Sequence, residues 1–162
     1  MEIIMIELRR LNLEEKTDMD LFNVMSEQYY TDVCAPDELS QEIADLYDDE
    51  LNAELIEQTK RQKDPYYIMG IENNKNCIGF ISYTIYQSNQ QCFINNFYIT
   101  SLYRNQGFGA IAYTKAEEHI RKQGSLMISL LPEKRAVSFY QRLGFSESGK
   151  TKNGEIIFRK LL

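Results

Sequence analysis

The chain has 162 residues, of which 43% are hydrophobic and 26% are charged, and its formal net charge is −6. This length predicts a single domain over residues 1–162, and the composition excludes both a disordered chain and a membrane protein. No apolar run approaches the ~20 residues that span a bilayer, and an acidic chain is a poor candidate for non-specific nucleic-acid binding, so we expect no membrane and no nucleic acid as partner.

The first third of the chain predicts one strand followed by two helices. Residues 3–10 are mostly apolar and predict a strand; Glu2 and the shortness of the apolar run argue against a signal peptide. Apolar side chains then recur at helical intervals over 18–33 and over 37–60. The second of these helices places acidic residues opposite its apolar face, and Pro65 follows its end.

The remaining residues predict strands and helices in alternation. Helices are expected at 107–123 and 133–143, and strands at 66–72, 77–86, 91–100, 125–131, 145–150 and 155–160. The strand–helix–strand step over 91–131 predicts a parallel pair of strands joined by a right-handed crossover. The predicted fold class is therefore α/β, with a mixed sheet.

The segment 104–109, with the sequence RNQGFG, lies between an expected strand and an expected helix. Its two glycines let the backbone approach a ligand closely, and the helix N-terminus adds unpaired N–H donors and positive potential. These features predict a pyrophosphate-binding turn, although a tight turn alone also explains the glycines. The segment lacks the lysine of a nucleotide P-loop and the third glycine of the dinucleotide fingerprint.

A second motif, AVSFYQRLGF, covers residues 136–145. By itself it predicts an amphipathic helix that packs through Phe139 and Leu143 and ends at Gly144. On this interpretation Tyr140 is a core aromatic residue whose hydroxyl is satisfied.

Taken together, in this order and spacing, the two motifs closely resemble the GNAT superfamily of acyl-CoA-dependent N-acetyltransferases. The matching residues are Phe97-Tyr98-Ile99, R-x-x-G-x-G at 104–109, and A-x-x-F-Y-x-x-L-G-F at 136–145. The resemblance spans about residues 66–160, and the preceding strand and helices fit the family's layout. It implies a GNAT-like fold, a central mixed sheet flanked by helices, in one N-acetyltransferase domain.

The resemblance also implies a reaction: transfer of an acetyl group from acetyl-CoA to a primary amine of a small molecule or peptide, by direct attack in a ternary complex. The residues implied to bind the co-substrate are Phe97, Tyr98, Ile99, Arg104, Asn105, Gln106, Gly107, Phe108 and Gly109. A backbone N–H near Tyr98 would polarise the thioester carbonyl. Tyr140 lies where the family places the general acid that protonates the leaving sulfur, and a phenol with a pKa of ~10 suits that task.

Two positions depart from the family pattern. Many members have an acidic residue shortly before the equivalent of Phe97, but this chain has Asn95 and Asn96, and an amide cannot take a proton. The base is then a carboxylate elsewhere, water through a chain, or absent. Glu133 replaces an asparagine that is frequent in the family, and a carboxylate there is less favourable to an anionic co-substrate.

Charge is distributed unevenly along the chain. Residues 1–64 contain 18 acids and 6 bases, net −12, whereas residues 65–162 contain 6 acids and 12 bases, net +6. The basic part is the part that would hold the polyanionic coenzyme A, and Lys134, Arg135 and Arg142 are near the second motif. The acidic helices favour a cationic acceptor such as a polyamine, or they are simply solvated faces.

The remaining candidates indicate little chemistry. Cys34, Cys77 and Cys92 lack metal or disulfide spacing, which indicates free thiols, a cytoplasmic location and no metal site. His119 is expected at a surface or boundary position. Six tyrosines are either candidates for an acceptor pocket or packing residues: Tyr29, Tyr30, Tyr66, Tyr67, Tyr83 and Tyr86.

Two other functions stay open at this stage. A non-catalytic acyl-CoA-binding sensor or interaction module would keep the same fold, and the missing carboxylate near Asn95 supports it. A nucleotide-binding protein would use the glycine turn alone. The sequence leaves a homodimer possible and does not identify the acceptor.

Overall fold

The computed structural model describes residues 4–162, which form a seven-stranded mixed sheet flanked by helices. In chain order the elements are β1 (Ile6–Arg10), α1 (Lys16–Val33), α2 (Pro36–Leu46), α3 (Asp49–Lys60), β2 (Tyr66–Asn73), β3 (Asn76–Tyr86), β4 (Gln91–Ile99), the 3-10 turn η1 (Ser101–Tyr103), α4 (Phe108–Lys122), β5 (Met127–Leu130), the 3-10 turn η2 (Lys134–Ala136), α5 (Val137–Arg142), β6 (Ser146–Lys150) and β7 (Ile156–Leu161). The strands are ordered β1-β2-β3-β4-β5-β7-β6. The mixed α/β sheet expected from the sequence is confirmed.

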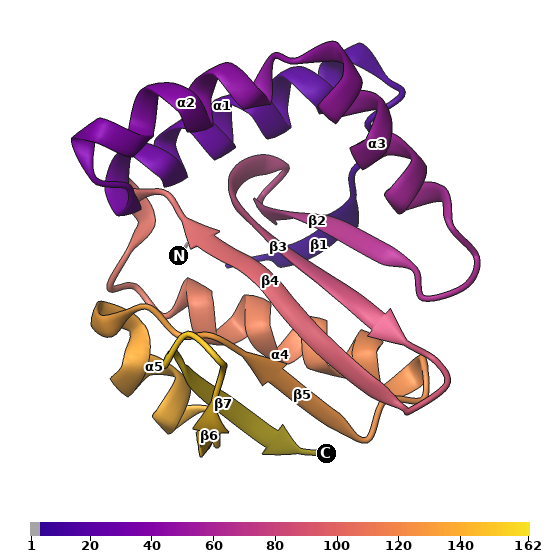
Figure 1. Cartoon of the computed structure of the whole chain (residues 1–162), viewed down its shortest axis with the longest axis vertical. Coiled ribbons are helices and arrows are strands. Elements are labelled where there is room, and N and C mark those ends of the chain that lie inside the picture. Colours follow the sequence, from indigo (N-terminus) through magenta and orange to yellow (C-terminus); the bar gives the residue numbers. More distant parts are fainter. Residues whose placement is uncertain (1–3) are drawn as a thin grey trace.

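Helices cover both faces of the sheet. Figure 1 shows α1, α2 and α3 on one side and α4 and α5 on the other. Alternation along β3 explains this arrangement: Ile81 and Tyr83 pack into the core beneath α4, whereas Phe80, on the opposite face, packs with side chains of α1. No helix within residues 4–162 is long and apolar enough to cross a bilayer.

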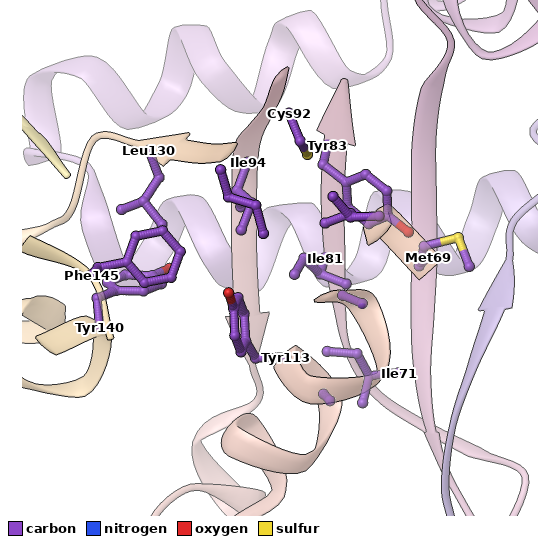
Figure 2. Close-up of a cluster of buried hydrophobic side chains, with 14 of the residues drawn as sticks. Met69, Ile71, Ile81, Tyr83, Cys92, Ile94, Tyr113, Leu130, Tyr140 and Phe145 are labelled. Carbon is purple, nitrogen blue, oxygen red and sulfur yellow. The ribbon is translucent and has the colours of Figure 1, made fainter. Parts of the chain in front are cut away.

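The main core lies between the sheet and α4. It contains apolar side chains from every strand except β6, and Tyr113, Ala116 and Ile120 of α4 are almost completely buried in it. Figure 2 shows part of this cluster, with Tyr140 and Phe145 beside one another at one end. The core therefore extends to the second motif, whose residues Tyr140 and Phe145 are buried in it.

The helix expected over 37–60 is wrong in one respect, because it is two helices. Tyr47 and Asp48 interrupt it, and the Asp48 side chain accepts a hydrogen bond of 2.9 Å from the backbone N–H of Leu51. An aspartate in extended conformation is a favourable N-cap, and Asp49 and Glu50 place further negative charge in the first turn of α3. The first residue of the strand expected over 3–10 lies outside the described residues.

The centre of the sheet opens beside the end of β4. The parallel pairing of β4 with β5 runs only from Gln91 opposite Met127 to Phe93 opposite Ser129. Beyond it, β4 continues to Ile99 with β3 as its partner. Between Ser82 and Tyr83 the β3–β4 register shifts, which leaves Asn95 as an additional residue in β4. The last residues of β4 therefore have a free edge.

Candidate functional site

A cavity of about 650 Å³ lies against this part of β4. Its walls come from the end of β4, the glycine turn, the start of α4, and the η2–α5 segment. Nine of the ten predicted site residues line it: Phe97, Tyr98, Ile99, Arg104, Asn105, Gly107, Phe108, Gly109 and Tyr140. Gln106 does not; it is exposed, and its side-chain amide donates a 3.1 Å hydrogen bond to the carbonyl oxygen of Leu102.

The glycine turn presents its backbone to the cavity. Asn105 and Gly107 have φ values of 60° and 82°, and Gly107 is the N-cap residue of α4. A Cβ at Gly107 would meet no heavy atom within 4 Å, so the space in front of the turn is open. Within residues 4–162, the amides of 105–110 have no hydrogen-bond acceptor. The turn therefore offers a set of unpaired donors at a helix N-terminus.

Gly109 lies one residue inside the helix, against the aromatic wall of the cavity. A Cβ at this position would come within 3.3 Å of two ring atoms of Phe139. The Phe139 ring also packs edge-on against Phe97, with ring centroids 5.7 Å apart. A small residue at position 109 thus brings the turn, β4 and α5 together.

The Arg104 side chain fastens the glycine turn to two other elements. Its Nε donates to the carbonyl oxygen of Ile99, and its Nη2 donates to Asp32 Oδ2 near the end of α1, both at 2.7 Å. The Tyr98 hydroxyl donates to the same carboxylate oxygen at 3.2 Å. The hydrogen bond from Arg104 is the main reason why the pKa of Asp32 lies below its usual value.

Tyr140 lines the same cavity from α5. It is 8% exposed, and its ring packs against Phe139 and Phe145 with centroids 5.3 and 5.7 Å away. Burial, and then the negative charge of Glu133, raise the pKa of its phenol, so the hydroxyl stays protonated at neutral pH. Within residues 4–162 this hydroxyl has no hydrogen-bond partner, although it belongs to a cavity-lining residue. Tyr140 therefore has an uncommitted proton beside the cavity.

Glu133 is the only carboxylate among the described residues that line the cavity. Its Oε1 accepts a hydrogen bond of 3.2 Å from the Tyr29 hydroxyl of α1, and its Oε2 lies 3.6 Å from Arg135 Nε. Burial and this carboxylate raise the pKa of Tyr29. The contact joins two segments that are 104 residues apart in the chain.

The asparagines in β4 contribute no acid to the cavity. Asn95 is exposed, and its Oδ1 accepts a 3.2 Å hydrogen bond from the Thr84 hydroxyl. Asn96 donates to the Ser82 hydroxyl at 3.3 Å. Both amides thus face partners on β3.

The basic residues and tyrosines divide between cavity and core. Arg135 and Arg142 line the cavity, whereas Lys134 does not. Of the six candidate tyrosines, Tyr29 alone lines it among the described residues. His119 is half-buried, as expected at a boundary, and its Nδ1 lies 2.6 Å from the hydroxyl of the buried Tyr83.

Sequence patterns did not reveal the contacts that α1 makes. Asp32 and Tyr29 belong to no motif, and their partners follow 72 and 104 residues later. For Glu133 a signal existed, because it replaces the asparagine that is frequent in the family three residues before the second motif. This departure is visible in the sequence, whereas the hydrogen bond from Tyr29 to Glu133 is not.

Solved structures share this architecture over almost the whole chain. The PaiA N-acetyltransferase from Thermoplasma acidophilum, in complex with coenzyme A, is 21% identical, with a TM-score of 0.78 over 98% of this chain and 99% of that chain. A spermidine N-acetyltransferase chimera from Vibrio cholerae and hSSAT is 18% identical, with a TM-score of 0.69 over 96% and 94%. An aminoglycoside 6'-N-acetyltransferase complexed with coenzyme A is 15% identical, with a TM-score of 0.68 over 96% of both chains.

These identities establish a shared fold and no more, and no curated protein matches the sequence. The family comparison is independent of them. The model of the acetyltransferase (GNAT) family matches residues 20–145, which include most of α1, the glycine turn and the whole second motif. The early end of the β4–β5 pairing and the glycine turn at the N-terminus of α4 agree with this match. The match shows that the chain belongs to the GNAT acetyltransferase family.

Proposed function

We propose that this protein transfers the acetyl group of acetyl-CoA to a primary amine. One observation carries the proposal: a single cavity is lined both by the glycine turn with its unpaired amides and by Tyr140 with its uncommitted hydroxyl. An anion-binding turn and a proton donor in one cavity are what a thioester with a phosphate-bearing leaving group requires.

The residues of the cavity fit coenzyme A. The amides of 105–110 supply donors for the pyrophosphate, and the open space at Gly107 leaves room for it. Arg135 and Arg142 add positive charge at the same cavity. The free edge of β4 over Phe97, Tyr98 and Ile99 offers backbone groups to the amides of the pantetheine arm.

Tyr140 is the proposed general acid. When the amine nitrogen bonds to the thioester carbonyl carbon and the C–S bond breaks, Tyr140 donates its phenolic proton to the sulfur. A backbone N–H near Tyr98 stabilises the negative charge that develops on the carbonyl oxygen. The phenolate of Tyr140 then regains a proton from the nitrogen of the new amide.

The proposed acceptor is a small molecule or peptide, and a cationic amine suits it best. The first 64 residues carry a net charge of −12, and α1, which reaches the cavity through Tyr29, belongs to this acidic part. The enzymes of two similar structures are named for spermidine and for an aminoglycoside. From its free cysteines we place the protein in the cytoplasm.

A thiol-release assay with acetyl-CoA and a panel of amines tests this function. The panel contains spermidine, an aminoglycoside, simple alkylamines and a peptide with a free N-terminus. The wild-type protein is expected to release coenzyme A with at least one of them. Tyr140→Phe is expected to lower kcat by a factor of about 10²–10⁴, the usual contribution of a general acid, while calorimetry shows unchanged affinity for acetyl-CoA.

The same measurements separate the enzyme from a sensor. A sensor binds acetyl-CoA, but neither the wild-type protein nor the variant transfers the acetyl group to any amine. A protein that is stabilised against heat by ATP or NAD and not by coenzyme A contradicts both functions. Full activity of Tyr140→Phe removes Tyr140 from the mechanism.

A further inference from the structure

The proposed reaction needs a proton acceptor that the second motif and the glycine turn do not contain. A primary alkylamine resembles the lysine side chain, whose pKa is ~10.4, so at neutral pH it arrives as an ammonium ion. Its nitrogen becomes a nucleophile only after it loses a proton. Asn95 and Asn96 of β4 cannot accept one, and both are hydrogen-bonded to β3.

Among the described residues that line the cavity, Glu133 alone carries a carboxylate. Its side chain is 40% exposed, so solvent and acceptor can reach it. Asp32 contacts two residues that line the cavity, but its Oδ2 already accepts hydrogen bonds from both of them, Arg104 and Tyr98. Asp32 therefore holds the glycine turn in place, and Glu133 remains for the acceptor.

The surroundings of Glu133 suit a bound ammonium group. Tyr29 contacts it from α1 and Arg135 from its own segment. Besides burial, the charge of Glu133 also raises the pKa of Tyr140 in α5 and of Cys34 at the end of α1. Arg135 Nε is 3.6 Å away, which is too long for a direct hydrogen bond, so the carboxylate keeps free acceptor positions. The Tyr29 hydroxyl, at 3.2 Å, fixes one oxygen and leaves the other for a ligand.

Glu133 and the proposed general acid line the same cavity. Glu133 accepts the 3.2 Å hydrogen bond from the Tyr29 hydroxyl, and its negative charge contributes to the raised pKa of the Tyr29 and Tyr140 phenols. A base and an acid in one small cavity act on the two ends of the same reaction, the incoming nitrogen and the leaving sulfur.

We propose that the Glu133 carboxylate, oriented by Tyr29, binds the ammonium group of the acceptor and accepts its proton. This inference rests on the proposed function. An N–H bond of the ammonium breaks and an O–H bond forms on Glu133, which frees the nitrogen lone pair for the thioester carbonyl carbon. Glu133 later releases this proton to water, while Tyr140 protonates the sulfur and is restored by the second nitrogen proton.

Glu133→Gln tests the inference, because it keeps the shape of the side chain and removes the base. The readout is kcat/KM for two matched acceptors: the alkylamine of the panel that the wild-type protein uses best, and its β-trifluorinated analogue. The fluorines lower the basicity of the amine, so the analogue is already neutral at the assay pH. Glu147→Gln, in exposed β6, is the matched control for loss of one negative charge.

For the alkylamine, Glu133→Gln is expected to lower kcat/KM by a factor of about 10²–10⁴, the range of general acid–base catalysis. With the neutral analogue it is expected to keep most of its activity, and its affinity for coenzyme A stays the same or increases because a negative charge is lost. Tyr29→Phe keeps the carboxylate of Glu133 but removes its hydrogen bond. It is expected to lower kcat/KM for the alkylamine by a smaller factor and again to spare the neutral analogue. Glu147→Gln is expected to leave kcat/KM unchanged for both acceptors.

An equal loss with both acceptors contradicts the inference, because it indicates a structural effect of Glu133. Unchanged activity with both contradicts it as well. These results leave the proposed function in place as long as the wild-type protein transfers acetyl groups. A wild-type protein that acetylates no amine in the panel contradicts the proposed function, and this inference with it.

Discussion

The groups that line the cavity are of two kinds: some belong to the backbone and others to side chains. One wall, which we call the main-chain wall, consists of the turn 104–110 and the free edge of β4, and it offers backbone amides. The other, the side-chain wall, consists of Glu133 and Tyr140 together with Tyr29 of α1, and it offers one carboxylate and two phenols.

This difference predicts different responses to mutation. Backbone donors belong to every residue, so the main-chain wall changes only when a substitution alters φ or fills the space in front of the turn. Each group of the side-chain wall comes from one residue, so the loss of a single atom removes it. Binding of the co-substrate is therefore expected to depend on conformation, and chemistry on residue identity.

The largest effect on the main-chain wall is expected from Gly109→Glu. It places a side chain and a negative charge where the turn would hold the pyrophosphate, and like charges in contact cost several kcal/mol, so affinity for acetyl-CoA falls by more than about 100-fold. Calorimetry measures this. Gly109→Ala is the control, since its uncharged Cβ meets the Phe139 ring at 3.3 Å and Ile99 Cγ1 at 4.0 Å, and is expected to reduce affinity far less. Unchanged affinity of the Glu variant would remove the turn from the site.

A smaller effect is expected from Gly107→Ala. Gly107 has a φ of 82°, and a residue with a Cβ in this conformation costs about 1–2 kcal/mol. Urea denaturation is expected to show this loss of unfolding free energy, and calorimetry a weaker binding of coenzyme A. Gly154→Ala is matched, because Gly154 has a φ of 84° and is equally free of neighbours within 4 Å. Gly154→Ala is expected to lose the same unfolding free energy and to bind coenzyme A with unchanged affinity. Weaker binding of coenzyme A by Gly154→Ala would contradict the assignment of the main-chain wall.

The smallest effect is expected from Asp32→Asn, which weakens the link between α1 and the main-chain wall. The Asp32 and Arg104 side chains are about one-third exposed, 31% and 32%, so their ion pair contributes only about 1 kcal/mol at neutral pH. The pKa of Asp32 is lowered in the folded state. Its stabilisation is therefore complete above the unfolded-state pKa of about 3.9 and is lost as the pH falls through the lower folded-state pKa.

Thermal denaturation over a pH series measures this dependence. The wild-type protein and Asp32→Asn should differ most at neutral pH, and their melting temperatures should converge in acid. Asp20→Asn, in an exposed ion pair with Lys16 on the same helix, is the control and should change stability less. A difference that grows as the pH falls would show that the sign assigned to Asp32 is wrong.

Local patterns in the sequence were sufficient for the elements and for the main-chain wall. Alternation and helical periodicity are properties of neighbouring residues, so the strands and most helix positions followed from them. The exception was the region 37–60, where Asp48 caps a new helix although the apolar pattern continues across it. The capping signal is a single residue, Asp48, whereas the helical spacing of apolar residues extends over the whole region. The spacing therefore predicted one continuous helix.

The sequence by itself determined the family and the residues of the glycine turn, because a helix N-terminus and the conformation of a glycine are local properties of the chain. Only the tertiary structure decided which side chains meet across the cavity. Tyr29 reaches Glu133 from 104 residues away, and Asp32 reaches Arg104 from 72. Such contacts depend on how α1 packs on the sheet, and no pattern among neighbouring residues predicts which side chains that packing brings together.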